Sequence, residues 1–123
     1  MLFDTYSWVE LFNDTEAGRR VANLINAETA ATAMATISEL TSWAIRNNRD
    51  PSLIIENVKR LSAILEFRED IAKLAGELHI QYKKEMKDFG MVDSMIYATA
   101  LANGLKLVTG DRHFVGKKDV EMI

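Results

Sequence analysis

Four acidic residues, Asp4, Glu39, Asp93 and Asp111, lie at the edges of apolar segments of this chain. Each acid either ends a strand-like run or opens a helix-like one. If the fold gathers these segment ends, four carboxylates share one pocket, and divalent cations bound through oxygen most readily relieve their repulsion. The pattern therefore indicates metal-dependent phosphodiester chemistry.

Each of the four acids also has a purely structural explanation. Asp4 can cap a helix at a strand exit, Glu39 can complement the dipole in a first helical turn, and Asp93 can be a plain N-cap. The turn at residues 109–111 points more strongly to a site, because Gly110 lets the backbone bend while the acid faces the sheet edge. Taken one residue at a time, both explanations stay open.

The composition predicts a single globular domain over residues 1–123. Of the residues, 48% are hydrophobic and 27% are charged, and there is one proline, which fits a chain that buries one core. The chain has no cysteine, so it offers no disulfide framework or thiolate site and suits a reducing cytoplasm. No apolar run approaches the roughly 18 residues of a membrane span, and we expect neither export nor membrane insertion.

The formal net charge of the chain is −3, and without the four candidate acids the net charge of the remaining residues is +1. This charge balance does not by itself identify a polyanionic substrate. Basic residues form three clusters that could meet phosphates. A solvated face is the simpler explanation for each cluster alone. The clusters are Arg46 with Arg49, Lys83 with Lys84 and Lys87, and Arg112 with Lys117 and Lys118.

Periodicity and capping signals predict short strands separated by helices. Strands are expected over 1–5, 29–37, 64–67, 105–109 and 120–123. Helices are expected to start near residues 15, 38, 51, 68 and 93, and the first helix at one of two helix-starting side chains, Asp4 or Ser7. Such an order implies a parallel sheet with helices on both faces. Ligands bind such sheets at the carboxyl ends of the strands, where Asp4 and Asp111 lie.

Taken together, the segments resemble a PIN domain, specifically the VapC-like toxins of toxin–antitoxin pairs. The likeness is carried, in the family's order, by Phe3-Asp4-Thr5, Ile37-Ser38-Glu39-Leu40, Val92-Asp93-Ser94-Met95-Ile96-Tyr97-Ala98-Thr99-Ala100 and Leu107-Val108-Thr109-Gly110-Asp111-Arg112-His113-Phe114. The resemblance implies an α/β fold, a three-layer α/β/α sandwich with a central parallel sheet. It also implies metal-dependent endoribonuclease activity with Mg²⁺ or Mn²⁺.

Residue by residue, the resemblance makes the four acids the family's acidic quartet, with Thr109 as the hydroxyl residue beside it. We expect Asp4, Asp93 and Asp111 to bind metal directly or through water. Glu39 either ligates a second ion or orients the attacking water, and the sequence does not separate these roles. Hydrolysis by metal-activated water needs no side-chain nucleophile and would leave a 5′-phosphate and a 3′-hydroxyl.

The chain departs from some relatives just beyond the fourth acid, where it has Arg112 and His113 in place of another acid. This leaves open whether one or two ions bind. We expect a structural or surface role for His113, capping or orienting roles for Thr5, Ser38 and Ser94, and no function for His79.

The resemblance also implies partners: an RNA substrate, a small cognate antitoxin and a second copy of the chain. Apolar residues beyond those the core needs, namely Trp43, Ile45 and Ile55, are the candidates for the homodimer interface.

Other functional classes fit less well. An aspartate-nucleophile phosphatase would have a second aspartate at position 6, which is Tyr6, and a receiver domain would have paired acids before its first helix. No glycine-rich phosphate loop is present. The two remaining alternatives are a catalytically silent PIN-like module that binds RNA or protein, and a housekeeping RNA-processing nuclease. Silent modules typically lose acids of the quartet, whereas this chain keeps all four.

Overall fold

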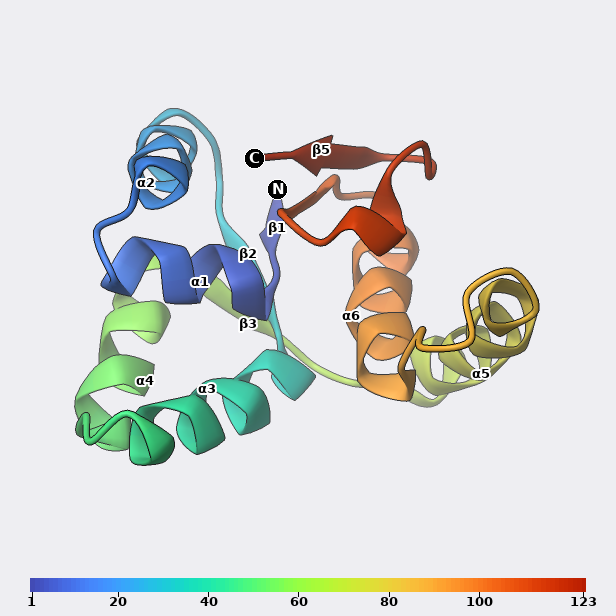
Figure 1. The fold of residues 1–123 in the computed structure, drawn as a ribbon, viewed down its shortest axis with the longest axis horizontal. Helices are drawn as coiled ribbons and strands as arrows, with labels where there is room; N and C mark the ends of the chain where they lie inside the picture. Colours follow the sequence, from blue (N-terminus) through green and yellow to red (C-terminus); the bar gives the residue numbers. More distant parts are fainter.

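Five short parallel strands form one sheet in the order β3-β2-β1-β4-β5 (Figure 1). The computed structural model describes residues 1–123. The strands are β1 (Leu2–Phe3), β2 (Ala31–Ala33), β3 (Ala63–Leu65), β4 (Leu107–Thr109) and β5 (Val120–Met122). The predicted central parallel sheet is confirmed.

Helices cover both faces of the sheet, so the predicted three-layer α/β/α sandwich is also confirmed (Figure 1). One face carries α1 (Thr5–Phe12), α2 (Glu16–Ala27), α3 (Met34–Arg46) and α4 (Pro51–Leu61). The other carries α5 (Glu69–Lys83) and α6 (Met91–Ala102), and a short 3₁₀ turn, η1 (Arg112–Phe114), follows β4. None of these helices is both long and apolar enough to span a bilayer.

The central strands divide the core between the two helical layers. In β1, Leu2 packs with the α5 and α6 side while Phe3 packs with the α1 to α4 side, and both are fully buried. Leu107 and Val108 of β4 alternate in the same way. Successive residues of a strand point to opposite faces, so strands buried on both sides are apolar throughout.

Three helix starts lie where the side chains predict them. Asp4 accepts a hydrogen bond from the Ser7 N–H, Thr15 accepts one from Gly18, and Asp50 accepts two at the start of α4. These caps satisfy amide donors that the first helical turn leaves unpaired.

Two predicted boundaries are wrong. The strand expected over 29–37 is only three residues long, because its neighbour β1 has just two residues to pair with it and Met34 and Ala35 are good helix formers. Glu39 therefore lies in the second turn of α3 and not in a first turn. Similarly, Asp93 is the third residue of α6, and Gly90 is the N-cap.

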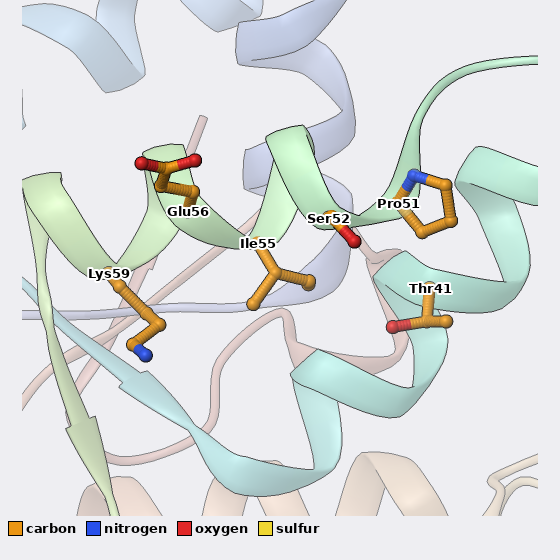
Figure 2. Close-up of a pocket in the computed structure, with 6 residues that line it drawn as sticks. All are labelled: Thr41, Pro51, Ser52, Ile55, Glu56 and Lys59. Atoms are coloured by element: carbon orange, nitrogen blue, oxygen red, sulfur yellow. The ribbon is translucent and has the colours of Figure 1, made fainter.

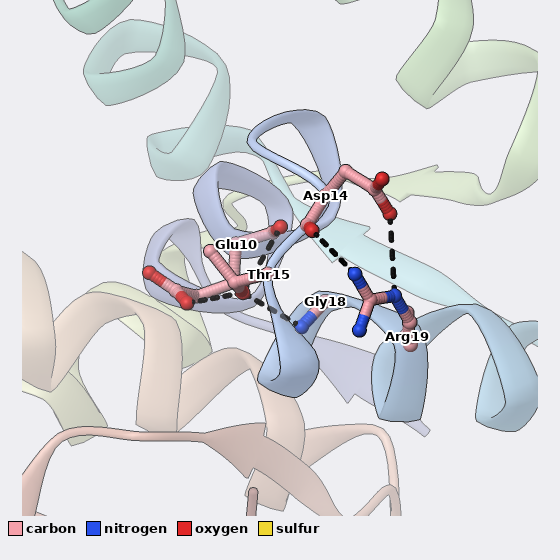
Figure 3. A network of polar contacts seen from close by, with 5 residues as sticks. All are labelled: Glu10, Asp14, Thr15, Gly18 and Arg19. Carbon is pink, nitrogen blue, oxygen red and sulfur yellow. Dashed lines mark hydrogen bonds and ion pairs between the residues drawn. The ribbon is translucent and has the colours of Figure 1, made fainter.

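The junction between α1 and α2 is held by a network of side-chain and backbone contacts (Figure 3). The Thr15 hydroxyl donates to the Glu10 carboxylate, and Arg19 donates to the Asp14 carbonyl at 3.4 Å. Gly18 lies so close to α1 that a Cβ there would come within 2.1 Å of the Glu10 carbonyl oxygen. Only glycine fits this approach.

The substitution Gly18→Ala should therefore destabilise the protein by ~2 kcal/mol or more, because the added methyl group collides with backbone. Gly76→Ala is the matched control: it lies inside α5 with nothing within 4 Å of an added Cβ. That change should stabilise by ~0.5 to 1 kcal/mol. Urea unfolding of both variants measures this, and a Gly18→Ala protein as stable as the parent contradicts the packing described.

Candidate active site

One open pocket of about 470 Å³ at the carboxyl edge of the sheet contains all four predicted acids. Asp4 follows β1, Asp111 follows β4, and Glu39 and Asp93 project from α3 and α6. The remaining lining residues are Thr5, Tyr6, Ile96, Gly110 and Arg112. Four segments far apart in the sequence thus bring their carboxylates to one place.

Asp4 is the most buried of the four, with 7% of its surface exposed. Its Oδ1 accepts from the Ser7 N–H at 2.8 Å and from the Ser7 hydroxyl at 2.9 Å. Burial raises the pKa of Asp4 to about 6, although hydrogen bonds from Thr109 and Ser7 oppose the rise, and the nearby Asp111 adds to it. The residue is thus both the helix cap that the sequence suggested and an acid of the pocket.

Glu39 and Asp93 are also held by donors. The Thr5 hydroxyl donates to Oε1 of Glu39, a contact that agrees with the capping or orienting role expected for Thr5. Asp93 Oδ2 accepts from the Gly90 N–H at 3.2 Å, so this acid reaches back to the helix start from its third position. Burial raises the pKa of Asp93, and the charges of Asp111 and Glu39 raise it further.

Thr109 connects two of the acids. It is fully buried, its hydroxyl accepts from the Asp111 N–H at 2.9 Å, and its hydrogen bond to Asp4 helps to keep that carboxyl ionised. Sequence reasoning considered Ser7 only as a helix start and missed that it donates to the Asp4 carboxylate, although its spacing from Asp4 is a recognisable capping signal. It also missed Tyr6, which lines the pocket and which no local signal identifies.

His113 lies between two carboxylates and packs edge-on against Phe89. Its Nε2 is 2.9 Å from Asp88 Oδ2, and its Nδ1 is 2.8 Å from Asp111 Oδ1, although the second contact lacks hydrogen-bond geometry. Burial acts to lower the pKa of His113, but the charges of Asp111 and Asp88 outweigh it and raise the pKa. These contacts agree with the structural role expected for this residue.

The donor set of the pocket fits a hard divalent cation. All four acids offer carboxylate oxygen. Burial raises the pKa of Asp4 and Asp93, and the neighbouring acids raise it further; a bound cation would offset both effects. No three acidic or histidine side chains already form a group placed to hold one ion directly. One oxygen of each acid is occupied by a local donor, so the residues suit an ion that keeps several of its waters, as Mg²⁺ does.

A separate hollow of about 410 Å³ lies between α3 and α4 (Figure 2). Its lining residues are Thr41, Pro51, Ser52, Ile55, Glu56 and Lys59. With a single acid among them, this hollow has no acidic cluster, and it is not the site that the sequence predicts.

The sequence matches the PIN domain family over residues 1–119. This chain belongs to the PIN domain family. None of the curated proteins matches the chain significantly. As a PIN domain, it has its acidic pocket at the carboxyl edge of the sheet, formed by the same segments that carry the resemblance.

Solved structures share this PIN fold along nearly the whole chain. A toxin–antitoxin complex from Klebsiella pneumoniae has 24% sequence identity and a TM-score of 0.79, covering 98% of this chain and 95% of that one. VapBC2 from Rickettsia felis, bound to a DNA fragment from its promoter, has 17% identity and a TM-score of 0.78, covering 98% and 96%. The VapC20 toxin of Mycobacterium tuberculosis, which cleaves the sarcin-ricin loop, has 17% identity and a TM-score of 0.68, covering 85% and 84%.

The raised pKa of Asp4 predicts how the stability of the metal-free protein depends on pH. The folded chain holds the Asp4 proton up to about pH 6, whereas the unfolded chain releases it near 3.8, so this group's contribution to stability is lost as pH rises from about 4 to 6. Asp4→Asn cannot ionise. Its stability relative to the parent should therefore rise across that window, by up to ~3 kcal/mol.

Urea unfolding in chelator, between pH 4 and 7.5, measures this difference. Asp50→Asn changes the exposed cap of α4 in the same chemical way and is the control. A constant difference between Asp4→Asn and the parent over the whole range would show that Asp4 is not a buried acid of this kind.

Proposed function

We propose that this PIN domain is a metal-dependent endoribonuclease that cleaves RNA in the cytoplasm as the toxin of a VapBC-type toxin–antitoxin pair. The observation that carries the proposal is the convergence of Asp4, Glu39, Asp93 and Asp111 on one open pocket. The fold likeness to toxin–antitoxin structures, one of them a toxin that cleaves the sarcin-ricin loop, supports it.

The residues of the pocket would have different roles in RNA hydrolysis. When bound, Mg²⁺ or Mn²⁺ neutralises charge on the scissile phosphate and supplies an activated water. Asp4, Asp93 and Asp111 would hold the cation, and Thr109 keeps two of them in place. Glu39 has one oxygen bonded to Thr5, which leaves the other to ligate a second ion or to orient the attacking water. Arg112 at the rim forms no ion pair within the chain and can attract the phosphate.

The completeness of the acidic pocket argues for an enzyme over a silent binding module. A module that only bound RNA or protein would have no need for four mutually repelling carboxylates, two of which have raised pKa values.

Cleavage of RNA should require divalent metal. We expect the purified chain to cut RNA in Mn²⁺ or Mg²⁺, to stop in excess chelator and to recover when metal is restored, while Zn²⁺ substitutes poorly for a site of oxygen ligands. The products should carry 5′-phosphate and 3′-hydroxyl ends, which end-labelling detects. Undiminished cleavage after exhaustive chelation, or products with cyclic phosphates, would overturn the mechanism.

The substitution Asp93→Asn separates catalysis from capping. Asparagine can still accept from the Gly90 N–H, so the stability of the metal-free protein should hold or rise as one repelling charge is removed. RNA cleavage should nevertheless fall at least a hundredfold, which is a change of ~2.7 kcal/mol in the barrier. Asp70→Asn, an exposed acid in the first turn of α5, is the matched control and should cleave like the parent. Cleavage by Asp93→Asn within about twofold of the parent would remove Asp93 from the site.

We also propose that the chain pairs with a small antitoxin and with a second copy of itself. Of the three residues considered for the homodimer, Trp43 stacks on Phe12 with ring centroids 6.3 Å apart and Ile55 is half-buried, whereas Ile45 is 62% exposed. Ile45 is therefore the strongest remaining candidate for the homodimer interface. Sedimentation of the chain alone tests the homodimer, and a monomer at high concentration would contradict it. Coexpression with the product of the neighbouring reading frame tests the antitoxin. If no complex forms and cleavage is undiminished, that pairing is contradicted.

A further inference from the structure

A second hollow of about 520 Å³ lies beside the acidic pocket, in the groove between α1 and α3. The two hollows share Thr5, Tyr6 and Glu39. The rest of the groove is lined by Val9, Glu10, Ser38, Ser42, Trp43 and Arg46. Because the two hollows share these wall residues and therefore adjoin, a chain-like substrate cut at the acids can extend along this groove.

Tyr6 lies where the two hollows meet. Its ring rests on the backbone of Gly110, where an added Cβ would lie 2.2 Å from Tyr6 Cε1. The side chain is 44% exposed, and none of the aromatic pairs in the chain includes it. The ring is therefore supported from one side and free to receive a flat ligand beside the acids.

Arg46 gives the far end of the groove a free positive charge. It lies seven residues beyond Glu39 on α3, which places it roughly 10 Å further along the helix axis. Its Nε donates to the Ser42 carbonyl at 3.4 Å, and it forms no ion pair with any carboxylate. Arg49, the other residue of that basic cluster, is instead used inside the fold, where it packs on Trp43 and donates to the Phe12 carbonyl.

The groove is also lined by two acids, Glu10 and Glu39, and the first of them is held by a local donor. The Glu10 carboxylate accepts a hydrogen bond from the Thr15 hydroxyl at the start of α2 (Figure 3). Arg46 is the one cationic side chain in the lining, so an anionic ligand in the groove would pair with it while the reacting phosphate lies at the acids and their cation.

We infer that Tyr6 is a stacking platform for an unpaired RNA base next to the cleaved bond, and that Arg46 binds a phosphate further along the same strand. The inference rests on the proposed ribonuclease activity and adds which side chains hold the RNA strand beside the cut. A base within a duplex has both faces covered by its neighbours, whereas an unpaired base can stack on an aromatic ring.

The test uses a synthetic single-stranded RNA with one mapped cut, together with copies that lack the base at either nucleotide adjoining the cut. For the parent, removing the stacked base should raise KM roughly tenfold. Tyr6→Ala should raise KM by a similar factor on the intact RNA, keep kcat within about threefold, and show no further loss when the base is also missing. Tyr6→Phe should behave like the parent, because the ring is kept.

Two further arms guard against trivial explanations. Ile80→Ala, an exposed apolar change on α5 outside both hollows, should leave KM unchanged. Anisotropy of fluorescein-labelled RNA in chelator should show the same tenfold weakening of binding for Tyr6→Ala, without any dependence on turnover.

The phosphate contact of Arg46 is tested by salt dependence. Arg46→Gln should reduce the slope of log affinity against log salt concentration by roughly 0.7, the value for one contact to single-stranded nucleic acid. Arg60→Gln on α4 should leave the slope as it is.

Four outcomes would contradict the role of Tyr6 or the proposed function. The stacking role is wrong if Tyr6→Ala keeps the parent's KM. It is also wrong if the KM increase caused by Tyr6→Ala and the KM increase caused by the missing base multiply when both are combined. In either case the nuclease assignment stands. If Tyr6→Ala cleaves normally but escapes inhibition by a protein partner, the groove belongs to that protein and the inference is overturned. If the folded parent neither binds nor cuts any RNA in metal, the proposed function itself fails and takes the inference with it.

Discussion

The rest of the structure depends on the end of β1 at Phe3, in the middle of the sheet. The Asp4 N–H still donates to the Val108 carbonyl at 3.2 Å, as a strand residue would, while the Asp4 side chain already caps α1. The Ser7 hydroxyl has a single proton and two acceptors in reach, Asp4 Oδ1 at 2.9 Å and the Val108 carbonyl at 2.8 Å. Strand, helix and carboxylate are thus fixed by the same few atoms, and the burial this requires is what raises the Asp4 pKa.

The other three acids are built on the same plan, in which a nearby donor holds one oxygen. Thr5 holds Glu39, the Gly90 amide holds Asp93, and the His113 amide holds Asp111. Each carboxylate is oriented by its own segment before any cation arrives, and the sheet brings the four segments together. The local donors offset part of the repulsion among the acids, so the metal-free fold can tolerate a pocket of like charges.

The parts of the fold that follow from local chemistry could be predicted from the sequence. Caps at Asp4, Thr15 and Asp50 are determined by neighbours within a few residues, and the acids could be assigned to one site because they lie at segment ends. The start of α3 could not be predicted, because it depends on the length of β1, which is β2's partner in the sheet. Long-range packing was equally hidden: no local pattern indicates that Trp43 stacks on Phe12, 31 residues away in the sequence.

The contact between Tyr6 and Gly110 joins two positions that are remote in sequence and adjacent in space. A side chain at position 110 has no room while a ring occupies position 6, whereas a small residue at position 6 would lift that restriction. Among related proteins, a residue larger than glycine at position 110 should therefore be accompanied by a small residue at position 6 or by a ring that has turned away from it. A designer who transplants either residue into a relative must move both.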